Sequence, residues 1–182
     1  MAQEQVWDRE YRNSKFLTKE NKPQSDVVRF VQFLKKEVGI IPENFNILDL
    51  GSGAGRNSFY FAEMGNIVTG LEISKTAVNI AKEYANSAGL NINYVKQSIG
   101  EKFPIEDSSV DIALDITSSN SLTEAEREVF LSETNRVLKN GAYFFTKALC
   151  KDGDENAKYL IKNNPGKERD TYIMPEIGVT ER

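Results

Sequence analysis

The stretch Asn46-Ile47-Leu48-Asp49-Leu50-Gly51-Ser52-Gly53-Ala54-Gly55-Arg56-Asn57 decides the fold. Its first five residues are typical of a short buried strand, which runs directly into a cluster of three glycines. Glycine permits backbone angles that other residues avoid, and it lets a ligand approach the main chain closely. In an open parallel sheet, ligands bind beyond the carboxyl ends of the strands, where this loop would lie. The stretch therefore predicts a strand, a ligand-binding loop and the start of a helix.

Strand and helix patterns alternate on both sides of this stretch. Short apolar runs predict further strands over residues 67–72, 92–95, 110–116 and 142–147. Apolar residues at helical spacing, with caps and glycine stops, predict helices over residues 25–38, 56–64, 74–87, 123–138 and about 155–162. This alternation implies right-handed crossovers and a mainly parallel sheet covered by helices on both faces. We expect a Rossmann-like, doubly wound α/β fold with the strand order 3-2-1-4-5.

Composition narrows the possible chemistry. The 182 residues suffice for one domain, and the net charge of −4 does not favour binding to nucleic acid or anionic lipid. Histidine is absent, which excludes histidine-based catalytic triads and histidine-bearing metal sites, and no metal is expected. The single cysteine, Cys150, allows no intrachain disulfide. Neither a secretory signal nor an apolar run of about 18 residues is found, so we expect a cytoplasmic protein that does not enter membranes.

An acidic residue follows the glycine loop at a spacing along the sequence that is typical of a ribose-binding carboxylate. Glu72 lies 21 residues after Gly51 (72 − 51), at the end of the next predicted strand. A carboxylate there can accept hydrogen bonds from both hydroxyls of a ribose. The alternative is a glycine-rich turn with a solvated glutamate nearby. A dinucleotide fingerprint would place its third glycine where this chain has Arg56, and no Gly-Lys-[Ser/Thr] closes the glycine run as in a P-loop.

Several motifs together resemble the class I S-adenosylmethionine-dependent methyltransferases. Residues 47–57 resemble the first motif of that family, residues 68–74 resemble its second, and residues 103–111 resemble the segment before its fourth strand. Gly55-Arg56-Asn57 and Trp7-Asp8-x-x-Tyr11 look most like the branch that contains the tellurite-resistance and thiopurine methyltransferases. The resemblance spans about residues 7–149 and implies S-adenosylmethionine as cofactor and S-adenosylhomocysteine as product.

The resemblance assigns the methionine end of the cofactor to the glycine loop. Asp49 and the backbone of Gly51, Ser52, Gly53 and Gly55 would hold it. Arg56 and Asn57 open the following helix, where a helix N-terminus suits a carboxylate. Their alternative role is a solvated first turn.

The resemblance places the nucleoside further along the chain. Glu72 would bind the ribose and Ile73 would lie against the adenine. The acid that the family often uses for the adenine amino group falls here on Ser98 or Ile99, because the alignment is ambiguous by one residue. Asp115 and Ile116 would face the methyl-transfer centre. Asp115 has an alternative role, which is to cap a hydroxyl of the loop that follows it.

The N-terminal segment, residues 1–23, is expected to cover the cofactor and the substrate. Trp7 and Tyr11 match an aromatic motif that folds over the cofactor in related enzymes, and aromatic faces stabilise cations such as a sulfonium. Alternatively, Trp7 only packs the N-terminus on the core. Residues 24–182 would then form a single methyltransferase domain.

The expected activity is methyl transfer to a small-molecule acceptor, through sulfur, selenium or tellurium, by in-line displacement. Such a reaction depends mainly on proximity and needs no dedicated base for a soft, ionised acceptor. If a base is needed, Asp115 is the first choice. Asp115-Ile116-Thr117-Ser118 lacks the motif of nucleic-acid amino-methyltransferases, so nucleic acid is not expected as a partner. The alternatives are a non-catalytic nucleoside- or cofactor-binding domain and, less favoured, an NAD(P)-binding protein.

The C-terminal part departs from the family pattern. Family members continue past the fifth strand with a helix and an antiparallel strand pair, whereas this sequence ends at Arg182. We therefore expect a truncated domain whose final strand pair is incomplete or missing, with residues 172–174 starting a sixth strand. The expected state is a monomer or a homodimer.

Overall fold

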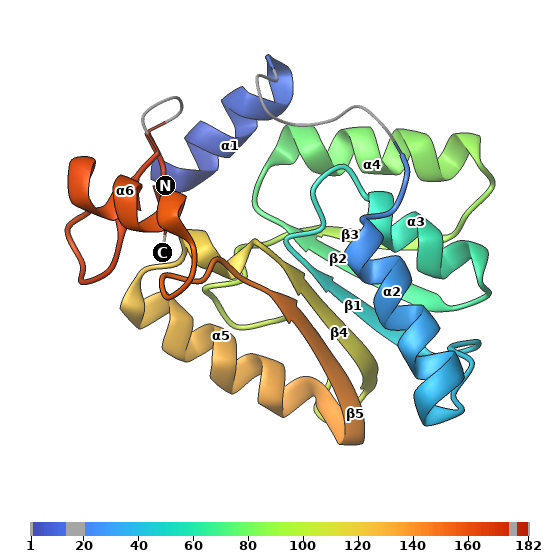
Figure 1. The fold of residues 1–182 in the computed structure, drawn as a ribbon. Coiled ribbons are helices and arrows are strands. Elements are labelled where there is room, and N and C mark those ends of the chain that lie inside the picture. Colours follow the sequence, from blue (N-terminus) through green and yellow to red (C-terminus); the bar gives the residue numbers. More distant parts are fainter. Residues whose placement is uncertain (1, 14–20, 175–177, 182) are drawn as a thin grey trace.

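The fold is built on a five-stranded parallel sheet of order β3-β2-β1-β4-β5 (Figure 1). The computed structural model describes residues 2–13, 21–174 and 178–181. Neighbouring strands are parallel throughout the sheet. The strands are β1 (Asn46–Leu50), β2 (Ile67–Glu72), β3 (Ile92–Lys96), β4 (Val110–Ile116) and β5 (Leu138–Lys147). The predicted fold class and strand order are confirmed.

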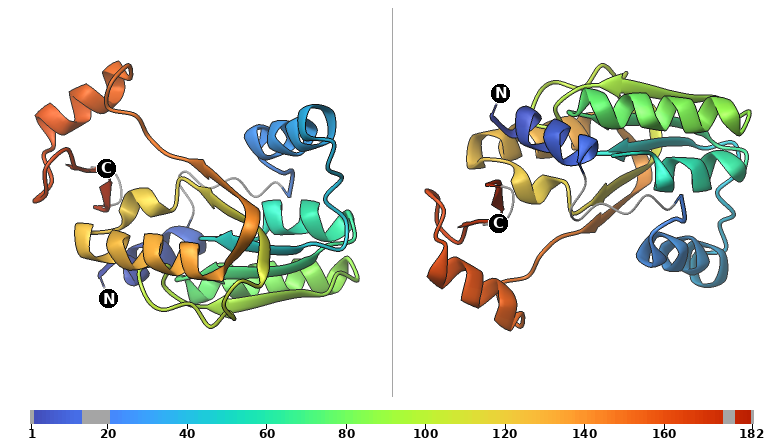
Figure 2. Two further views of the ribbon diagram at one scale, coloured as in Figure 1. Left: turned by 90° about the horizontal axis from the view of Figure 1, so that it is seen from below. Right: turned by 90° about the horizontal axis from the view of Figure 1, so that it is seen from above.

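Helices cover both faces of the sheet, and each face has its own core. On one face, α2 (Ser25–Phe33) and α3 (Arg56–Glu63) pack through Val31 and Phe61 against Ile112 and Leu114 of the sheet. On the other face, α5 (Glu124–Val137) packs through Phe130 against Leu48 and its neighbours. Successive residues of β1 and β4 therefore point into opposite cores, as expected of strands buried on both sides. The layers are visible in Figure 2.

Local signals fix where the helices begin. Gly55 adopts φ 93° as the N-cap of α3, and Ser74 accepts a hydrogen bond from the Ala77 N–H at 3.1 Å at the start of α4 (Lys75–Ser87). Thr123 and Glu126 form the predicted capping box at the start of α5, so both orphan backbone donors there are satisfied. These starts agree with the sequence prediction because capping depends on residues that are adjacent in the chain.

Three elements differ from the prediction. Residues 2–12 form a helix, α1 (Ala2–Arg12), where the sequence suggested only a polar leader. The end of the helix predicted over residues 25–38 is a π-helix, η1 (Leu34–Val38). Strand β5 begins at Leu138 instead of residue 142, and its pairing with β4 shifts register between Val110 and Ile112.

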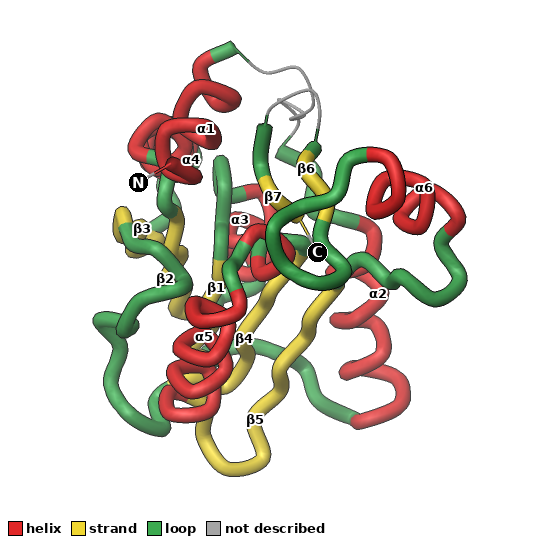
Figure 3. Tube along the Cα trace, turned by 90° about the vertical axis from the view of Figure 1, so that its left-hand side faces the viewer, coloured by secondary structure: helices red, strands yellow, loops and turns green. Residues whose placement is uncertain are grey.

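The C-terminal region lies beyond the main sheet. Helix α6 (Glu155–Asn163) agrees with the predicted helix and stands away from the layered body in Figure 2. Strands β6 (Tyr172–Ile173) and β7 (Thr180–Glu181) pair antiparallel in a sheet of their own (Figure 3). The sixth strand expected at residues 172–174 therefore forms, but it does not extend the five-stranded sheet. Within the described ranges, no helix is long and apolar enough to cross a membrane.

Candidate functional site

A cavity of about 560 Å³ opens at the carboxyl ends of the central strands. It lies where the strand order reverses between β1 and β4, which is the usual ligand position in such sheets. Its volume is in the range of small-molecule sites. Most residues predicted for the site line this cavity: Trp7, Tyr11, Asp49, Gly51, Ser52, Gly53, Arg56, Asn57, Glu72, Ile73, Ser98, Ile99 and Ile116. Gly55 and Asp115 do not line it.

The glycine loop requires glycine for two separate reasons. Gly51 and Gly53 have φ of 72° and 56°, a region that other residues rarely adopt. A Cβ on Gly53 would also lie 2.4 Å from the hydroxyl oxygen of Tyr11, and one on Gly51 would lie 2.2 Å from Ser118 Oγ. Gly55 packs behind the loop, where a Cβ would meet the Tyr94 hydroxyl at 2.3 Å. Glycine is therefore required at these positions both because neighbouring side chains leave no room for a Cβ and because the backbone has positive φ.

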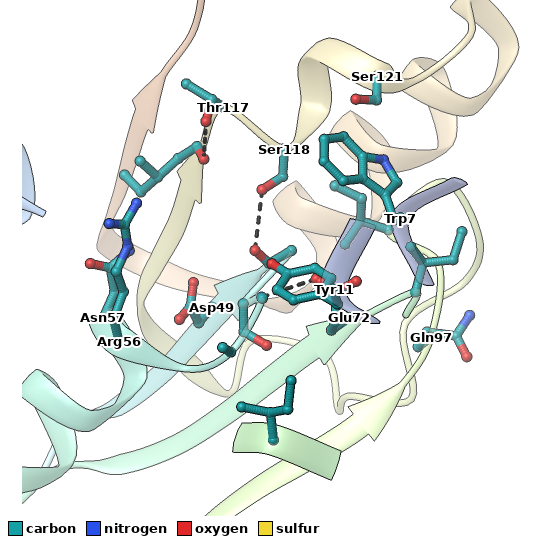
Figure 4. Close-up of a pocket in the computed structure, with 18 of the residues that line it drawn as sticks. Trp7, Tyr11, Asp49, Arg56, Asn57, Glu72, Gln97, Thr117, Ser118 and Ser121 are labelled. Atoms are coloured by element: carbon teal, nitrogen blue, oxygen red, sulfur yellow. Dashed lines mark hydrogen bonds between the residues drawn. The ribbon is translucent and has the colours of Figure 1, made fainter. Parts of the chain in front are cut away.

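Glu72 is held firmly at the end of β2. Its Oε2 accepts the Gly53 N–H at 3.0 Å, and its Oε1 accepts the Ser74 N–H at 2.7 Å. The side chain is only 6% exposed, and this burial raises its pKa to about 7 although the backbone hydrogen bonds oppose the shift. Figure 4 shows Glu72 beside the Tyr11 ring, and burial together with the Glu72 charge raises the pKa of the Tyr11 hydroxyl. The carboxylate is thus fixed in place and poorly solvated.

Asp49 is a second buried carboxylate at the cavity. Its Oδ2 accepts a hydrogen bond from Ser58 Oγ at 2.6 Å, and Ser58 itself is fully buried in α3. Burial raises the pKa of Asp49 to about 6, opposed mainly by the Ser58 hydrogen bond. Burial has removed water from the carboxylates of Glu72 and Asp49, so a polar or cationic ligand group beside them would stabilise their charged forms.

The two residues that open α3 have different surroundings. The Asn57 side chain donates to Gln24 Oε1 at 2.9 Å and accepts the Gln24 N–H at 3.0 Å. It thereby fixes the approach to α2, so its amide is largely engaged within the protein. Arg56 lines the cavity at the helix N-terminus, where its charge opposes the raised pKa of Asp49.

Asp115 is fully buried behind the loop that follows β4. Its carboxylate accepts hydrogen bonds from the backbone N–H groups of Ser118 and Ser119 at 3.1 and 3.0 Å. The hydroxyls of Ser119 and Thr146 donate to its other oxygen at 2.5 and 3.1 Å. This geometry favours the alternative role of Asp115, which is to cap the loop, over that of a base facing an acceptor.

A further wall comes from the end of β2, from α4 and from the segment after β3. Ile73, Ser98 and Ile99 lie there together with residues that sequence reasoning missed: Ile80, Glu83, Tyr84 and Gln97. Ser98 Oγ accepts the Gly100 N–H at 3.1 Å, and Gln97 donates to Glu101 at 2.9 Å. Both positions left open by the alignment therefore line the same wall. The sequence contains no sharp signal for Ile80 or Tyr84, which only reach the cavity because α4 packs against β3.

Helix α1 contributes residues to the cavity lining and packs against α4, which lies beside it in Figure 3. Asp8 Oδ1 accepts hydrogen bonds from the Thr76 N–H at 2.8 Å and from Ser74 Oγ at 3.0 Å. Asp8 also pairs with Arg12 at 2.5 Å, and Glu4 pairs with Lys96 at 2.6 Å. These contacts bring Trp7 and Tyr11 to the cavity, and their i, i+4 spacing is the sequence signal that predicts one helical face.

The loop after β4 supplies hydroxyls that were also missed. Thr117, Ser118 and Ser121 line the cavity, and Ser118 Oγ donates to the Gly51 carbonyl oxygen at 3.3 Å (Figure 4). Thr117 adopts φ 62°, which is strained for a β-branched residue. Such strain is often found at ligand sites, but the sequence pattern of this loop does not reveal it.

The residues present fit a nucleoside cofactor with an amino-acid tail. Ser52 Oγ is buried and finds no hydrogen-bond partner among the described residues, so it is free to serve a ligand. Glu72 offers carboxylate oxygens at the wall formed with Ile73, and Asp49 offers negative charge beside the glycine backbone. Fold and cavity together are typical of a class I methyltransferase.

Comparison with known proteins agrees with this class. Residues 47–141 match the family model described as a methyltransferase domain. The chain is 29% identical over 171 residues to a ubiquinone biosynthesis O-methyltransferase of Bartonella quintana, covering 81% of this chain and 69% of that protein. A solved S-adenosylmethionine-dependent methyltransferase of Methanosarcina mazei is 27% identical with a TM-score of 0.68, covering 88% of this chain and 76% of that one.

A more distant structure has the same fold. It is a phosphoethanolamine N-methyltransferase of Haemonchus contortus solved with S-adenosylhomocysteine, which is 18% identical with a TM-score of 0.63, covering 81% of this chain and 32% of that one. Because the matched family model spans more than half of the chain, the chain belongs to the methyltransferase domain family. It is a methyltransferase whose cofactor is S-adenosylmethionine.

Proposed function

We propose that the chain transfers a methyl group to a small-molecule acceptor bound beside the cofactor in the cavity described above. The observation that carries this proposal is the cavity itself. One part has fixed carboxylates at Glu72 and Asp49, and another has hydroxyls at Thr117, Ser118 and Ser121. Only the first part is needed to hold the cofactor, which leaves the second for an acceptor.

Each cofactor-binding residue has a definite task in this proposal. Glu72 accepts the ribose hydroxyls, while Ile73, Ser98 and Ile99 lie against the adenine. Asp49, Ser52, Gly51 and Gly53 hold the methionine part, with Arg56 near its carboxylate. Bound S-adenosylmethionine supplies a methyl group that is already activated by attachment to a positively charged sulfur. The protein then aligns the acceptor and excludes water, effects worth about 7–11 kcal/mol in well-oriented reactions.

The covering role of residues 1–23 is part of the proposal. Its support is the set of α1 contacts to α4 through Asp8, which hold Trp7 and Tyr11 against the cavity. An aromatic face near a sulfonium stabilises it by about 0.5–2 kcal/mol. Residues 1 and 14–20 of this segment lie outside the described residues. Residues 24–182 form the remaining methyltransferase domain in this proposal.

The acceptor atom is the open part of the proposal. Sulfur, selenium and tellurium were expected because they need no base. The similar Bartonella protein is named an O-methyltransferase, which favours an oxygen acceptor. An oxygen acceptor must lose a proton, so the two classes make different demands on the residues around the cavity. We favour oxygen, and we retain a thiol as the acceptor class to compare with it.

Methyl transfer is tested by supplying S-adenosylmethionine with catechol or thiophenol and measuring S-adenosylhomocysteine by mass spectrometry. Product that forms only when an acceptor is present supports the proposal. The variant Glu72→Gln should lose this activity at limiting cofactor, whereas Glu63→Gln, an exposed glutamate of α3 away from the cavity, should keep it. Cofactor binding without product, over a wide panel of acceptors, would instead favour a non-catalytic binding domain.

Other expectations from the sequence stay predictions. They are the affiliation with the tellurite-resistance and thiopurine branch, the absence of a nucleic-acid partner, a monomeric or homodimeric state and a cytoplasmic location. The branch affiliation rests on Trp7-Asp8-x-x-Tyr11 and Gly55-Arg56-Asn57. Methylation of a thiol or an inorganic selenium or tellurium oxyanion in preference to catechol would support it.

A further inference from the structure

A buried carboxyl group lies directly behind the hydroxyl-lined part of the cavity. Ser121, the last residue of η2 (Ser119–Ser121), lines the cavity, and its hydroxyl donates a hydrogen bond to Glu181 Oε1. Glu181 belongs to β7, which packs against η2. Sixty residues therefore separate two side chains that meet at one wall of the cavity. Neither Ser121 nor Glu181 is among the residues to which the proposed function assigns the cofactor.

The Glu181 side chain is buried, and no counter-charge to it is found in the part of the chain that the structure describes. Its residue is 5% exposed, and no ion pair to it is found among the described residues. A second contact fixes the same region, because the Glu168 carboxylate accepts the Glu124 N–H at 3.1 Å at the start of α5. The C-terminal region is thus tied both to η2 and to α5. A carboxyl group buried in this way, with one hydrogen-bond partner, requires an explanation.

Ser121 occupies the part of the cavity away from the cofactor carboxylates. In Figure 4 it lies beyond Trp7, on the opposite side from Glu72 and Asp49. Helix α1 reaches the same spot, because the Gln3 side chain donates to the Ser121 carbonyl oxygen. Since the Ser121 hydroxyl hydrogen points to Glu181, the oxygen lone pairs remain available to accept a hydrogen bond from a molecule in the cavity.

We propose that Ser121 and Glu181 form a proton relay that activates a hydroxyl group of the methyl acceptor. This inference rests on the proposed function. The acceptor O–H proton passes to Ser121 Oγ while the Ser121 proton passes to Glu181 Oε1. The acceptor oxygen forms a bond to the methyl carbon as the bond between that carbon and the donor sulfur breaks. The proton ends on Glu181, the sulfur retains the bonding electron pair as a neutral thioether, and the carboxyl later returns the proton to water.

The electrostatics agree with this geometry. Burial raises the pKa of Glu181 to about 7, and the Ser121 hydrogen bond opposes the shift. The elements packed most closely against β7 are β6 and η2. Their only titratable side chain is Tyr172, which lies opposite Glu181 in the strand register. A base that titrates near neutral pH is well matched to proton transfer at that pH.

The relay predicts different effects on two acceptors, whereas a purely structural role of Ser121 and Glu181 predicts equal effects. Catechol must lose a proton to react, whereas thiophenol is largely ionised by itself at neutral pH. In Glu181→Gln and in Ser121→Ala, methylation of catechol should fall about 10²-fold, the size typical of general-base catalysis, while methylation of thiophenol changes less than about threefold. The pH–rate profile of catechol methylation by wild type should fall on the acid side of about pH 7, and this fall should be absent in both variants. Glu168→Gln is the matched control, because it loosens the same region without touching the relay, and should affect both probes alike.

Three outcomes would count against the relay. Unchanged catechol methylation in Glu181→Gln overturns it directly. Equal losses with catechol and thiophenol, at unchanged melting temperature, assign Glu181 and Ser121 a purely structural role. A wild-type chain that binds S-adenosylhomocysteine but methylates none of a wide panel of acceptors contradicts the proposed function and the relay with it. Methyl transfer by the wild-type chain therefore separates failure of the proposed function from failure of the relay alone.

Discussion

Replacing Glu72 with glutamine should weaken cofactor binding at least tenfold. The carboxylate is oriented by the Gly53 and Ser74 N–H groups at 3.0 and 2.7 Å, so it needs no reorganisation when a ligand hydroxyl arrives. A charge-assisted hydrogen bond contributes about 1.5–3 kcal/mol, and each 1.4 kcal/mol is a factor of about ten. The dissociation constant for S-adenosylhomocysteine should therefore rise by roughly 10- to 150-fold.

Fluorescence provides a direct assay for this prediction. Trp7 is the only tryptophan of the chain and lines the cavity, so its emission should change when the cofactor product binds. Glutamine can accept only one of the two backbone N–H groups, so the melting temperature of Glu72→Gln must be recorded to show that the variant is folded. Glu63→Gln makes the same charge change at an exposed position and should bind like wild type. Equal dissociation constants for wild type and folded Glu72→Gln would refute the ribose assignment.

Three further predictions test the same site. Burial raises the pKa of Glu72 to about 7 from an ordinary 4.5, so the folded state holds a proton that the unfolded state releases. The Glu72 contribution to the free energy of unfolding should therefore fall as pH rises from 4.5 to 7. This contribution is measured as the difference in stability between wild type and Glu72→Gln in urea titrations. S-adenosylhomocysteine should bind about tenfold more weakly at pH 6 than at pH 8, because Glu72 is mostly protonated at pH 6. A pH-independent difference would contradict the shift. Gly53→Ala should lower the melting temperature more than Gly89→Ala, because both have positive φ but only Gly53 faces Tyr11; equal losses would exclude this contact. Asp115→Asn should lower stability by about 1.5–3 kcal/mol in chemical denaturation while leaving the pH profile of methyl transfer unchanged, and loss of a limb of that profile would restore Asp115 as a base.

Features that depend on adjacent residues were predictable from the sequence. Strand β1, the glycine loop and the capping box at Thr123 and Glu126 each depend on residues within a few positions of one another. The strand order followed because parallel strands joined by helices permit few topologies. The cavity wall containing Glu72 also followed, since carboxyl ends of parallel strands meet at one edge of the sheet.

Features that depend on distant contacts were not predictable. Helix α1 is polar overall, and its register against the fold is set by Asp8 hydrogen bonds to the start of α4. The pairing of Asn57 with Gln24, 33 residues away, also has no local signal in the sequence. The contact between Ser121 and Glu181 spans 60 residues and depends on how the C-terminal strands return to η2. Such pairings are decided by tertiary packing and carry no local signal.

The most direct test of the account is a calorimetric titration of the chain with S-adenosylmethionine, S-adenosylhomocysteine and NAD. The account predicts one binding site per chain for the first two ligands, with competition between them. It predicts no measurable heat from NAD at the same concentrations, because the loop has Arg56 where a dinucleotide site would have its third glycine. Tight binding of NAD together with no binding of S-adenosylhomocysteine would contradict the account.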